Sequence, residues 1–392
     1  MSGSEAREWG ASGLAHLTGR PDGAPDFSRA AVLRQAASLA DDLAGRLGID
    51  VSAAELLAGR AGLLGLSRRG RVSAGGASRL LRAADGWWAL TLSRPDDVDA
   101  VPALVELDVV PDDPWRAVES WCATCDVADV VDRSRLLGLP AAALGEASPA
   151  GPVIRRLGPR AAPRPVPGLL VVDLSSMWAG PLCGQLLARA GATVVKVETP
   201  GRPDGTRAGD RRFFDWMNAG KLCYSADLAE KTRALLETAD VVIESSRPAA
   251  LRQRGLGAED VAAQPGRVWL RITGYGADVD RANWTAFGDD AAVAGGVVGR
   301  SVDGPVFCGD AIADPLTGMQ AALQVAESLA RGGGEVIDVA MASVAATYAM
   351  LPESASETDL PAMPPAAPVV CQRAGDLGAD DALVERLVAE RA

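Results

Sequence analysis

The sequence predicts an α/β protein in which a large domain with a Rossmann-like parallel sheet is joined to a smaller α+β domain. Three observations support this fold class. The chain has 392 residues, 48% of them hydrophobic, enough to bury a sizeable core in two or three domains. From residue 169 onward, apolar runs typical of buried strands alternate with helical patterns. Two proline-rich stretches, 146–168 and 352–368, bound this alternation and predict linkers.

The part before the first linker predicts an arrangement of its own. Residues 1–60 are expected to pack with the large domain, and residues 61–145 to form the small α+β domain. The β-hairpin follows from an Asp-Gly pair between two apolar runs. The expected elements are a helix over 29–47, a hairpin over 80–92 that turns at Asp85-Gly86, and helices over 113–127 and 128–137.

The large domain is expected over 169–350, followed by a linker and tail over 351–392. Alternating strands and helices mean βαβ units, and ligands in such sheets bind at the carboxyl ends of the strands. Strands are predicted over 169–174, 193–198, 240–244, 268–273 and 335–340. Helices are predicted over 180–190, 229–238 and 313–331, with a short tail helix over 380–391.

The composition excludes several classes of function and of binding site. The net charge of −12 disfavours nucleic-acid and anionic-membrane binding. The single histidine, His16, removes multi-histidine zinc sites and leaves a Ser–His–acid hydrolase only if His16 is the base; we expect it to be a packing residue. The Cys122–Cys125 pair has no partner pair, so we expect ordinary thiols and no metal. Neither a signal peptide nor a membrane span is visible, which predicts a cytoplasmic protein.

Three features in the large domain could carry chemistry. Residues 175–181 form a strand-to-helix turn with Pro181 at a helix start, where free amides favour an anion, but GxGxxG is absent. Asp314 precedes a proline at another helix start, where it could cap the helix or act as a nucleophile. Basic residues follow several strands, where either surface charge or a phosphate ligand would explain them: Lys196, Arg202, Arg207, Arg211, Arg212, Lys221, Arg247, Arg252 and Arg254.

Taken together, residues 166–344 resemble a known family. The matching strings are VVDLSSMWAGPLCGQLLARAGATVVKVETP, RPDGTR, NAGKLCYSADL, ADVVIESSRPAALRQRGLGAEDV, ITGYG, FGDDAAVAGGV and GDAIADPLTGMQAAL. They are similar to the class III CoA-transferases, the CaiB/BaiF family, whose fold α-methylacyl-CoA racemases share. The resemblance implies the family III fold, a homodimer, acyl-CoA and carboxylic acid substrates, and no permanently bound cofactor.

The resemblance also implies a mechanism. The aspartate that attacks the acyl-CoA thioester in these transferases matches Asp314, and an acyl-aspartyl anhydride and an aspartyl-CoA thioester follow. Further positions that match CoA or substrate contacts are Trp178, Ala179, Arg207, Ser245, Ser246, Gln253, Arg254 and Asp290.

Some of these positions depart from the family pattern. Ser245 and Ser246 stand where Asn and Phe are common, and Gln253 stands where Arg is common. Asp289 stands where the racemases carry a histidine, with Asp290 as the acid shared with them, so racemase or isomerase activity is disfavoured. The first hypothesis is therefore a CoA-transferase. The second hypothesis is a non-catalytic CoA-binding or partner subunit, and the third is an acyl-CoA racemase or isomerase.

The leading region resembles a later part of the same pattern, so the halves look rearranged. About 165 residues precede the VVDL strand. Residues 19–25 and 299–305 resemble one another, and each is followed by a helical pattern. The first copy has no acid at the position of Asp314, and Asp26 is the nearest one. The family's glycine-rich lid is not evident, and Gly332–Gly334 is expected to be a turn.

Overall fold

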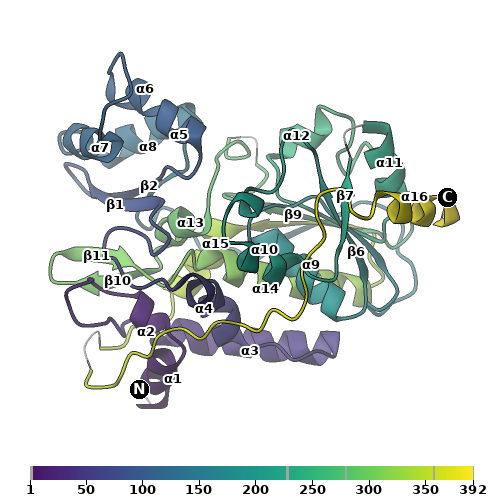
Figure 1. Cartoon of the computed structure of the whole chain (residues 1–392), viewed down its shortest axis with the longest axis horizontal. Helices are drawn as coiled ribbons and strands as arrows, with labels where there is room; N and C mark the ends of the chain where they lie inside the picture. Colours follow the sequence, from purple (N-terminus) through teal and green to yellow (C-terminus); the bar gives the residue numbers. More distant parts are fainter. Residues whose placement is uncertain (1–2, 227–228, 279, 356–357, 392) are drawn as a thin grey trace.

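The computed structural model describes residues 3–226, 229–278, 280–355 and 358–391. Its centre is a seven-stranded sheet, which is parallel except for one edge strand (Figure 1). This sheet confirms the predicted α/β class, and β6, β9 and β12 have the predicted bounds. The spatial order is β4 (Val153–Arg156), β12 (Glu335–Ala340), β9 (Val268–Thr273), β8 (Val241–Glu244), β5 (Leu170–Asp173), β6 (Thr193–Glu198) and β7 (Leu222–Ser225).

The proline-rich stretch 146–168, predicted to be a linker, contains the edge strand β4. This strand pairs antiparallel with β12, so Ile154 lies opposite Ile337. Its four residues are all exposed, and prolines at 152 and 159 bracket it. Proline is tolerated beside an edge strand, where one row of amides faces solvent. A short exposed strand has no apolar periodicity, so the sequence pattern could not reveal it.

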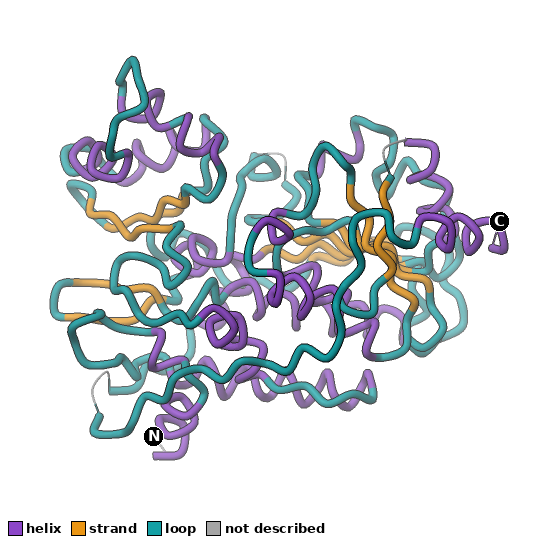
Figure 2. The backbone as a smooth tube through the Cα atoms, viewed as in Figure 1, coloured by secondary structure: helices purple, strands orange, loops and turns teal. Residues whose placement is uncertain are grey.

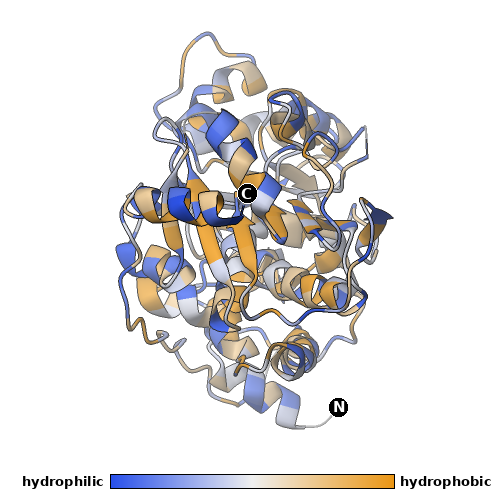
Figure 3. Ribbon diagram, turned by 90° about the vertical axis from the view of Figure 1, so that its right-hand side faces the viewer, coloured by the Kyte–Doolittle hydropathy of each residue, from blue (hydrophilic) through white to orange (hydrophobic). Residues whose placement is uncertain are grey.

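Each strand sends alternate side chains into two different cores. Val171 and Ile243 face α9 (Ala179–Arg189) and α14 (Ala313–Ala330), and Val172 faces the opposite side. That opposite side is covered by α11 (Ala229–Thr238) and α16 (Asp381–Arg391). Figure 3 shows the apolar strands at the centre, between helices with hydrophilic outer faces. Burial on both faces explains why these strands are near-continuous apolar runs.

The N-terminal helices form a further layer on α14. These are α1 (Gly3–Ala11), α2 (Leu14–Leu17), α3 (Ala30–Leu47) and α4 (Ala53–Leu64), and they share one core with the large domain. The two long ones end at Gly48 and Gly65 in the left-handed conformation, a common helix stop. The chain after residue 350 runs along this layer, where the Met363 amide donates to Gly10 (Figure 2).

The small domain has its own core around the buried Trp88. Its hairpin turns at Asp85-Gly86 as predicted, and Arg82 lies opposite Trp87. Cys122 and Cys125 are free thiols. The elements are β1 (Ser78–Arg82), β2 (Trp87–Thr91), β3 (Ala141–Ala143), α5 (Pro95–Asp99), α6 (Val101–Val105), α7 (Pro114–Cys122) and α8 (Val127–Leu136).

Several elements of the large domain were not predicted, because they are short or lack a clear period. Among them is a two-stranded hairpin, formed by β10 (Val298–Ser301) and β11 (Gly304–Phe307), that precedes α14. No helix built from the described residues has the length and apolarity needed to cross a bilayer. The unpredicted elements are η1 (Gly205–Ala208), α10 (Arg211–Asn218), β7, α12 (Pro248–Arg252), α13 (Gly288–Gly295), β10 (Val298–Ser301), β11 (Gly304–Phe307) and α15 (Met341–Ala349).

The order of the strands indicates where a ligand would bind. From β5 the chain adds β6 and β7 on one side, then crosses to add β8, β9 and β12 on the other. The direction of winding therefore reverses between β5 and β8. Open α/β sheets bind ligands outside the carboxyl ends of the strands at such a reversal. The segments after Asp173 and Glu244 lie at this position.

Candidate active site

The turn after β5 is held in a strained conformation. Met177 has φ of 74°, and its amide donates to both carboxylate oxygens of Asp204 at 3.2 Å. Ala311, just before α14, has φ of 43°. Among the described residues, Glu106 is the only other non-glycine residue with positive φ. Such strain concentrates at functional sites, because the surrounding structure must compensate for it.

A buried ionic network supports this turn. Lys221 Nζ lies 2.9 Å from Asp173, and Lys196 Nζ lies 2.8 Å from Asp204, with all four side chains inaccessible to solvent. Lys196 also donates to the carbonyl of Ser175. Removing one partner would leave an uncompensated buried charge. Lys196 and Lys221 are therefore structural, and neither is available to a phosphate ligand.

Asp314 does not cap its helix, which corrects the capping expectation. The helix α14 begins at Ala313, with Ile312 as an N-cap that has no side-chain hydrogen bond. Asp314 Oδ2 instead accepts a hydrogen bond from the Gly288 amide at 3.1 Å, and the Ala179 amide also donates to this carboxylate. A Cβ on Gly288 would lie 2.4 Å from Asp314 Oδ2, so this approach requires glycine.

The environment of Asp314 disfavours its charge. Burial, followed by the nearby charge of Asp289, raises the pKa of Asp314 to about 7, against the opposing charge of Arg60 and the two amide donors. Burial and the charge of Asp310 raise the pKa of Asp289 to about 6. Strongly shifted carboxyl groups in a cleft are candidates for catalysis, although structural networks also shift pKa values.

Asp289, Asp310 and Asp314 form what we call the carboxylate cluster, with Arg60 as its cation. Arg60 Nη1 lies 2.6 Å from Asp310 Oδ1. Asp289 Oδ1 accepts from the Ala311 amide at 3.0 Å, and its Oδ2 accepts from the Ser78 hydroxyl at 3.0 Å. The N-terminal region thus completes a site whose other parts lie more than 200 residues later. Among the described residues, no group of three or more His, Cys, Asp or Glu side chains could hold a metal ion.

Asp290 is adjacent in sequence but has a different role. Its Oδ1 accepts from the Thr91 hydroxyl at 2.9 Å and from the Phe287 amide at 3.0 Å, at the start of α13. Burial raises the pKa of Asp290 to about 8, and its Oδ2 has no hydrogen-bond partner. These contacts connect Asp290 to the small domain. Asp289, rather than Asp290, joins the carboxylate cluster.

Trp178 and Ala179, both predicted site residues, lie beside the cluster. The Trp178 side chain is 3% exposed, and its ring lies 5.3 Å from that of Phe213 in an edge-on arrangement. Its indole Nε1 is buried without a hydrogen-bond partner. The structure therefore brings together Asp314, Trp178 and Ala179.

Ser245 and Ser246 follow β8 at the reversal point. The Ser176 amide donates to Ser245 Oγ at 3.3 Å, which joins the turns after β5 and β8. Ser246 Oγ is buried without a partner. Gln253 and Arg254 are exposed just beyond α12.

Arg207 is engaged by other protein groups. Its Nη2 lies 2.6 Å from Glu198, its Nη1 donates to the Gly375 carbonyl at 3.2 Å, and its guanidinium lies 4.1 Å from the centre of the Phe214 ring. Arg211 and Arg212 are paired with Asp215 and Asp210 in the same way. These arginines hold local structure, so the count of basic residues overstated the cations available to a phosphate.

Sequence reasoning missed the contribution of the N-terminal region. Arg60 is the one basic residue in the mostly apolar string AAELLAGRAGLL of α4, whose other charge is Glu55 in the first turn, and a cation on such a helix was an available signal. The string SAGGAS, residues 73–78, supplies the hydroxyls of Ser73 and Ser78 to Asp289. Their distance from Asp314 in the chain concealed the relation.

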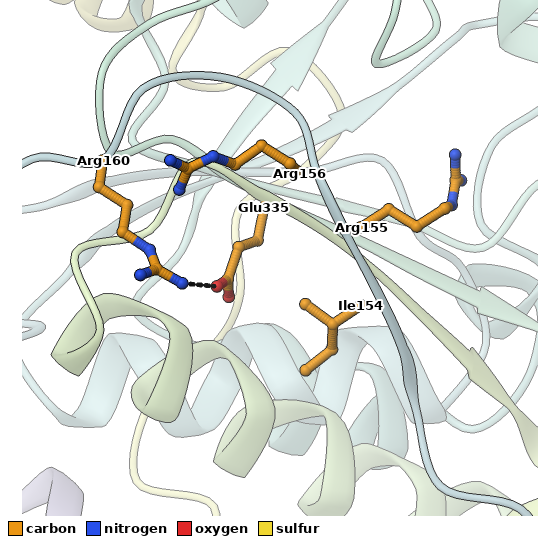
Figure 4. Close-up of a pocket in the computed structure, with 5 residues that line it drawn as sticks. All are labelled: Ile154, Arg155, Arg156, Arg160 and Glu335. Atoms are coloured by element: carbon orange, nitrogen blue, oxygen red, sulfur yellow. Dashed lines mark hydrogen bonds and ion pairs between the residues drawn. The ribbon is translucent and has the colours of Figure 1, made fainter.

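A surface pocket of about 390 Å³ lies elsewhere, at the amino end of β12. Figure 4 shows its lining, with Arg160 3.4 Å from Glu335. Because the carboxylate cluster lies beyond the carboxyl ends of the strands, the pocket is outside the candidate site. The lining residues are Ile154, Arg155, Arg156, Arg160 and Glu335.

Comparisons with known proteins agree with the resemblance noted in the sequence. The sequence model of CoA-transferase family III matches residues 166–376, more than half of the chain. Succinyl-CoA–D-citramalate CoA-transferase of Chloroflexus aurantiacus is 32% identical over 215 residues, covering 49% of this chain and 53% of the relative. Succinate–glutarate CoA-transferase of Agrobacterium fabrum is 33% identical over 208 residues, covering 46% and 52%.

The chain spans about half the length of these curated relatives. Among solved structures, a CaiB/BaiF family protein from Brucella suis is 30% identical, with a TM-score of 0.43 over 47% of this chain and 55% of that one.

Proposed function

The chain belongs to CoA-transferase family III, and on this basis we propose that it moves CoA between carboxylic acids, with Asp314 as the nucleophile. One observation carries the proposal. Asp314 is a carboxylate near the start of a helix that it does not cap, and the Gly288 and Ala179 amides hold it beside the reversal point of the sheet. A carboxylate there is available for covalent chemistry.

The proposed reaction has four balanced steps. An oxygen of ionised Asp314 attacks the thioester carbon and the C–S bond breaks. CoA thiolate departs, and an acyl-aspartyl anhydride remains. The thiolate attacks the aspartyl carbon, which releases the donor acid and leaves an aspartyl-CoA thioester. The acceptor carboxylate then attacks this thioester, expelling CoA thiolate and forming a second anhydride. The thiolate finally attacks the acceptor's acyl carbon, which releases the new acyl-CoA and regenerates Asp314. No permanently bound cofactor takes part, and acyl-CoA is a substrate.

The first step needs Asp314 in its charged form. With a pKa raised to about 7, the group is partly ionised at neutral pH, and the ionised fraction increases as the pH rises. A raised pKa also makes a carboxylate more basic, which favours its attack on the thioester. We therefore expect the acylation rate to rise through about pH 7 and then level off.

We propose that CoA lies at the carboxyl ends of β5 and β8. The buried Ser246 hydroxyl without a partner supports this placement, because a ligand atom would satisfy it. Ser245 would hold the neighbouring turn, and the exposed Gln253 and Arg254 would meet the phosphates. In this proposal Arg207 supports the fold through Glu198 rather than contacting CoA.

The test is to trap the covalent intermediate. The protein is incubated with a panel of acyl-CoAs, quenched with hydroxylamine or borohydride, and mapped by peptide mass. Succinyl-CoA is the first donor to try, because one relative is named for it and another for succinate. We expect a modified Asp314 peptide, which Asp314→Asn removes.

Other outcomes separate the alternatives. CoA binding without any modification would support a non-catalytic binding or partner subunit. Exchange of the α-proton with solvent deuterium, with Asp314 unmodified, would support a racemase or isomerase. Within the transferase proposal we also expect a homodimer in the cytoplasm, and sedimentation of the purified chain tests the oligomeric state.

A further inference from the structure

Arg60 is a charged residue in an otherwise apolar stretch of α4. This helix belongs to the N-terminal layer and packs on α10 and α14. A guanidinium on such a helix is costly to bury unless it meets an opposite charge. Arg60 meets one at the carboxylate cluster, where its Nη1 lies 2.6 Å from Asp310 Oδ1, 250 residues away in the chain.

The position of Arg60 is fixed on three sides. Asp310, whose side chain is 1% exposed, holds one end of the guanidinium. The centres of the Trp178 and Phe213 rings lie 5.6 and 5.4 Å from its Cζ, within the range of cation–π attraction. The Arg60 side chain itself is 24% exposed. A long side chain held in this way is preorganised and not a mobile surface charge.

The charges around Asp314 come from three elements. Asp289 on α13 and Asp310 in the loop before α14 are negative, and Arg60 on α4 is positive. The Gly288 and Ala179 amides add neutral donors. Arg60 is the only cation among these groups. Without it, an ionised Asp314 would face Asp289 and Asp310 with no countercharge.

We propose that Arg60 is the positioning residue that keeps Asp314 ionised for its attack on the thioester, acting through the carboxylate cluster. The proposal rests on the function proposed above and goes beyond it, because it assigns part of the site to the N-terminal region. The anchored ion pair with Asp310 places the guanidinium, and its remaining charge acts on Asp314 and Asp289. The carboxylate cluster thus joins a cation from the N-terminal region to three carboxylates from the large domain.

The kinetic test compares Arg60→Met and Arg60→Lys with the wild type. Single-turnover acylation of Asp314 is followed by mass from about pH 5.5 to about pH 9.5. We expect the rise in rate to shift by about one pH unit upward in Arg60→Met. The rate then falls by roughly fivefold near pH 7 and by roughly tenfold well below it, and the loss disappears at high pH. Arg60→Lys should recover most of the loss, because it keeps the charge.

A matched control comes from the same layer. Arg46 on α3 pairs with Glu327 on α14 at 3.3 Å and is 48% exposed. Arg46→Met should leave the pH profile unchanged. An Arg60→Met profile that keeps the wild-type midpoint, with or without a uniform loss of rate, would overturn the proposal, because a purely structural role predicts that result.

A second measurement does not depend on activity. Thermal unfolding of the wild type, Arg60→Met, Asp314→Asn and the double variant gives a double-mutant cycle, repeated at about pH 5 and about pH 9. We expect coupling between Arg60 and Asp314 at high pH, where Asp314 is charged, and little at low pH. Arg60→Gln replaces Arg60→Met if the latter fails to fold.

The two measurements separate the two proposals. Coupling without any acylation of the wild type would refute the transferase function and leave the electrostatic role of Arg60 standing. Acylation of the wild type, with no coupling between Arg60 and Asp314 and an unshifted midpoint of the Arg60→Met pH–rate profile, would support the transferase function and refute the role of Arg60.

Discussion

Two loop–helix segments of this chain are built from the same parts and carry carboxylates of different character. The first segment, residues 17–47, has a Gly19–Pro25 bridge followed by α3, and the second, residues 297–330, has the β10–β11 hairpin followed by α14. Each helix is 18 residues long, and the two helices pack together.

The carboxylate of the first segment is fully engaged by donors. Asp26, 2% exposed, accepts from the Ser28 amide at 3.0 Å, the Ser28 hydroxyl at 2.7 Å and the Arg300 amide at 2.8 Å. Asp314 in the second segment has two amide donors and a like charge, Asp289, nearby. The comparison teaches that the two carboxylates differ in their neighbours: three donors surround Asp26, whereas burial and a neighbouring carboxylate raise the pKa of Asp314.

The largest difference should appear in catalysis. Asp314→Asn should lower the transfer rate by on the order of 10³-fold or more, because the amide is a poor nucleophile. Asp26→Asn should keep the rate within about threefold, because Asp26 serves only the contact between the segments. Rates of acyl transfer from succinyl-CoA measure both. A large loss in Asp26→Asn would show that the first segment also takes part in the chemistry.

The next largest effect should be on stability, where we expect the substitution of Asp26 to cost more than that of Asp314. Asp26→Ala should lower the free energy of unfolding by about 2 to 4 kcal/mol, because it leaves the buried Ser28 hydroxyl and the part-buried Arg300 amide without their acceptor. Denaturant titration of the full chain measures this change. A loss below about 0.5 kcal/mol, typical of an ordinary surface substitution, would contradict a structural role for Asp26.

The raised pKa of Asp314 should also appear in the pH dependence of stability. The pKa of Asp314 is about 7 in the folded chain, against about 4 when unfolded, so folding disfavours the charged form and stability falls as pH rises between these values. Asp314→Asn should therefore raise the melting temperature by a few degrees above pH 7 and give no gain near pH 4. Melting scans across pH test this, and a pH-independent effect would refute it.

The smallest effect is expected for the surface ion pair between the two loops. Arg20 Nη1 lies 2.5 Å from Asp303, but the side chains are 39% and 56% exposed. Arg20→Gln should change the free energy of unfolding by at most about 0.5 kcal/mol, because solvent and salt screen the pair. A loss comparable to that of Asp26→Ala would mean that this pair, and not Asp26, fastens the segments together.

The sequence determined the elements whose burial leaves a local pattern. Apolar runs located β6, β9 and β12 to the residue, and an Asp-Gly pair placed the turn between β1 and β2. Asp314 could be named from its motif. The exposed strand β4 left no such pattern. The motif suggested Asp314 as a cap of α14, but the N-cap is Ile312, and Asp314 contacts the Gly288 amide instead.

Only the tertiary structure decided the charge around Asp314. Arg60 reaches Asp310 across 250 residues, and Ser78 reaches Asp289 across 211. Hydrophobic periodicity reports which face of an element is buried, because that depends on near neighbours in the chain. The electrostatic environment of a carboxylate instead depends on groups within a few ångströms in space, whatever their separation in sequence.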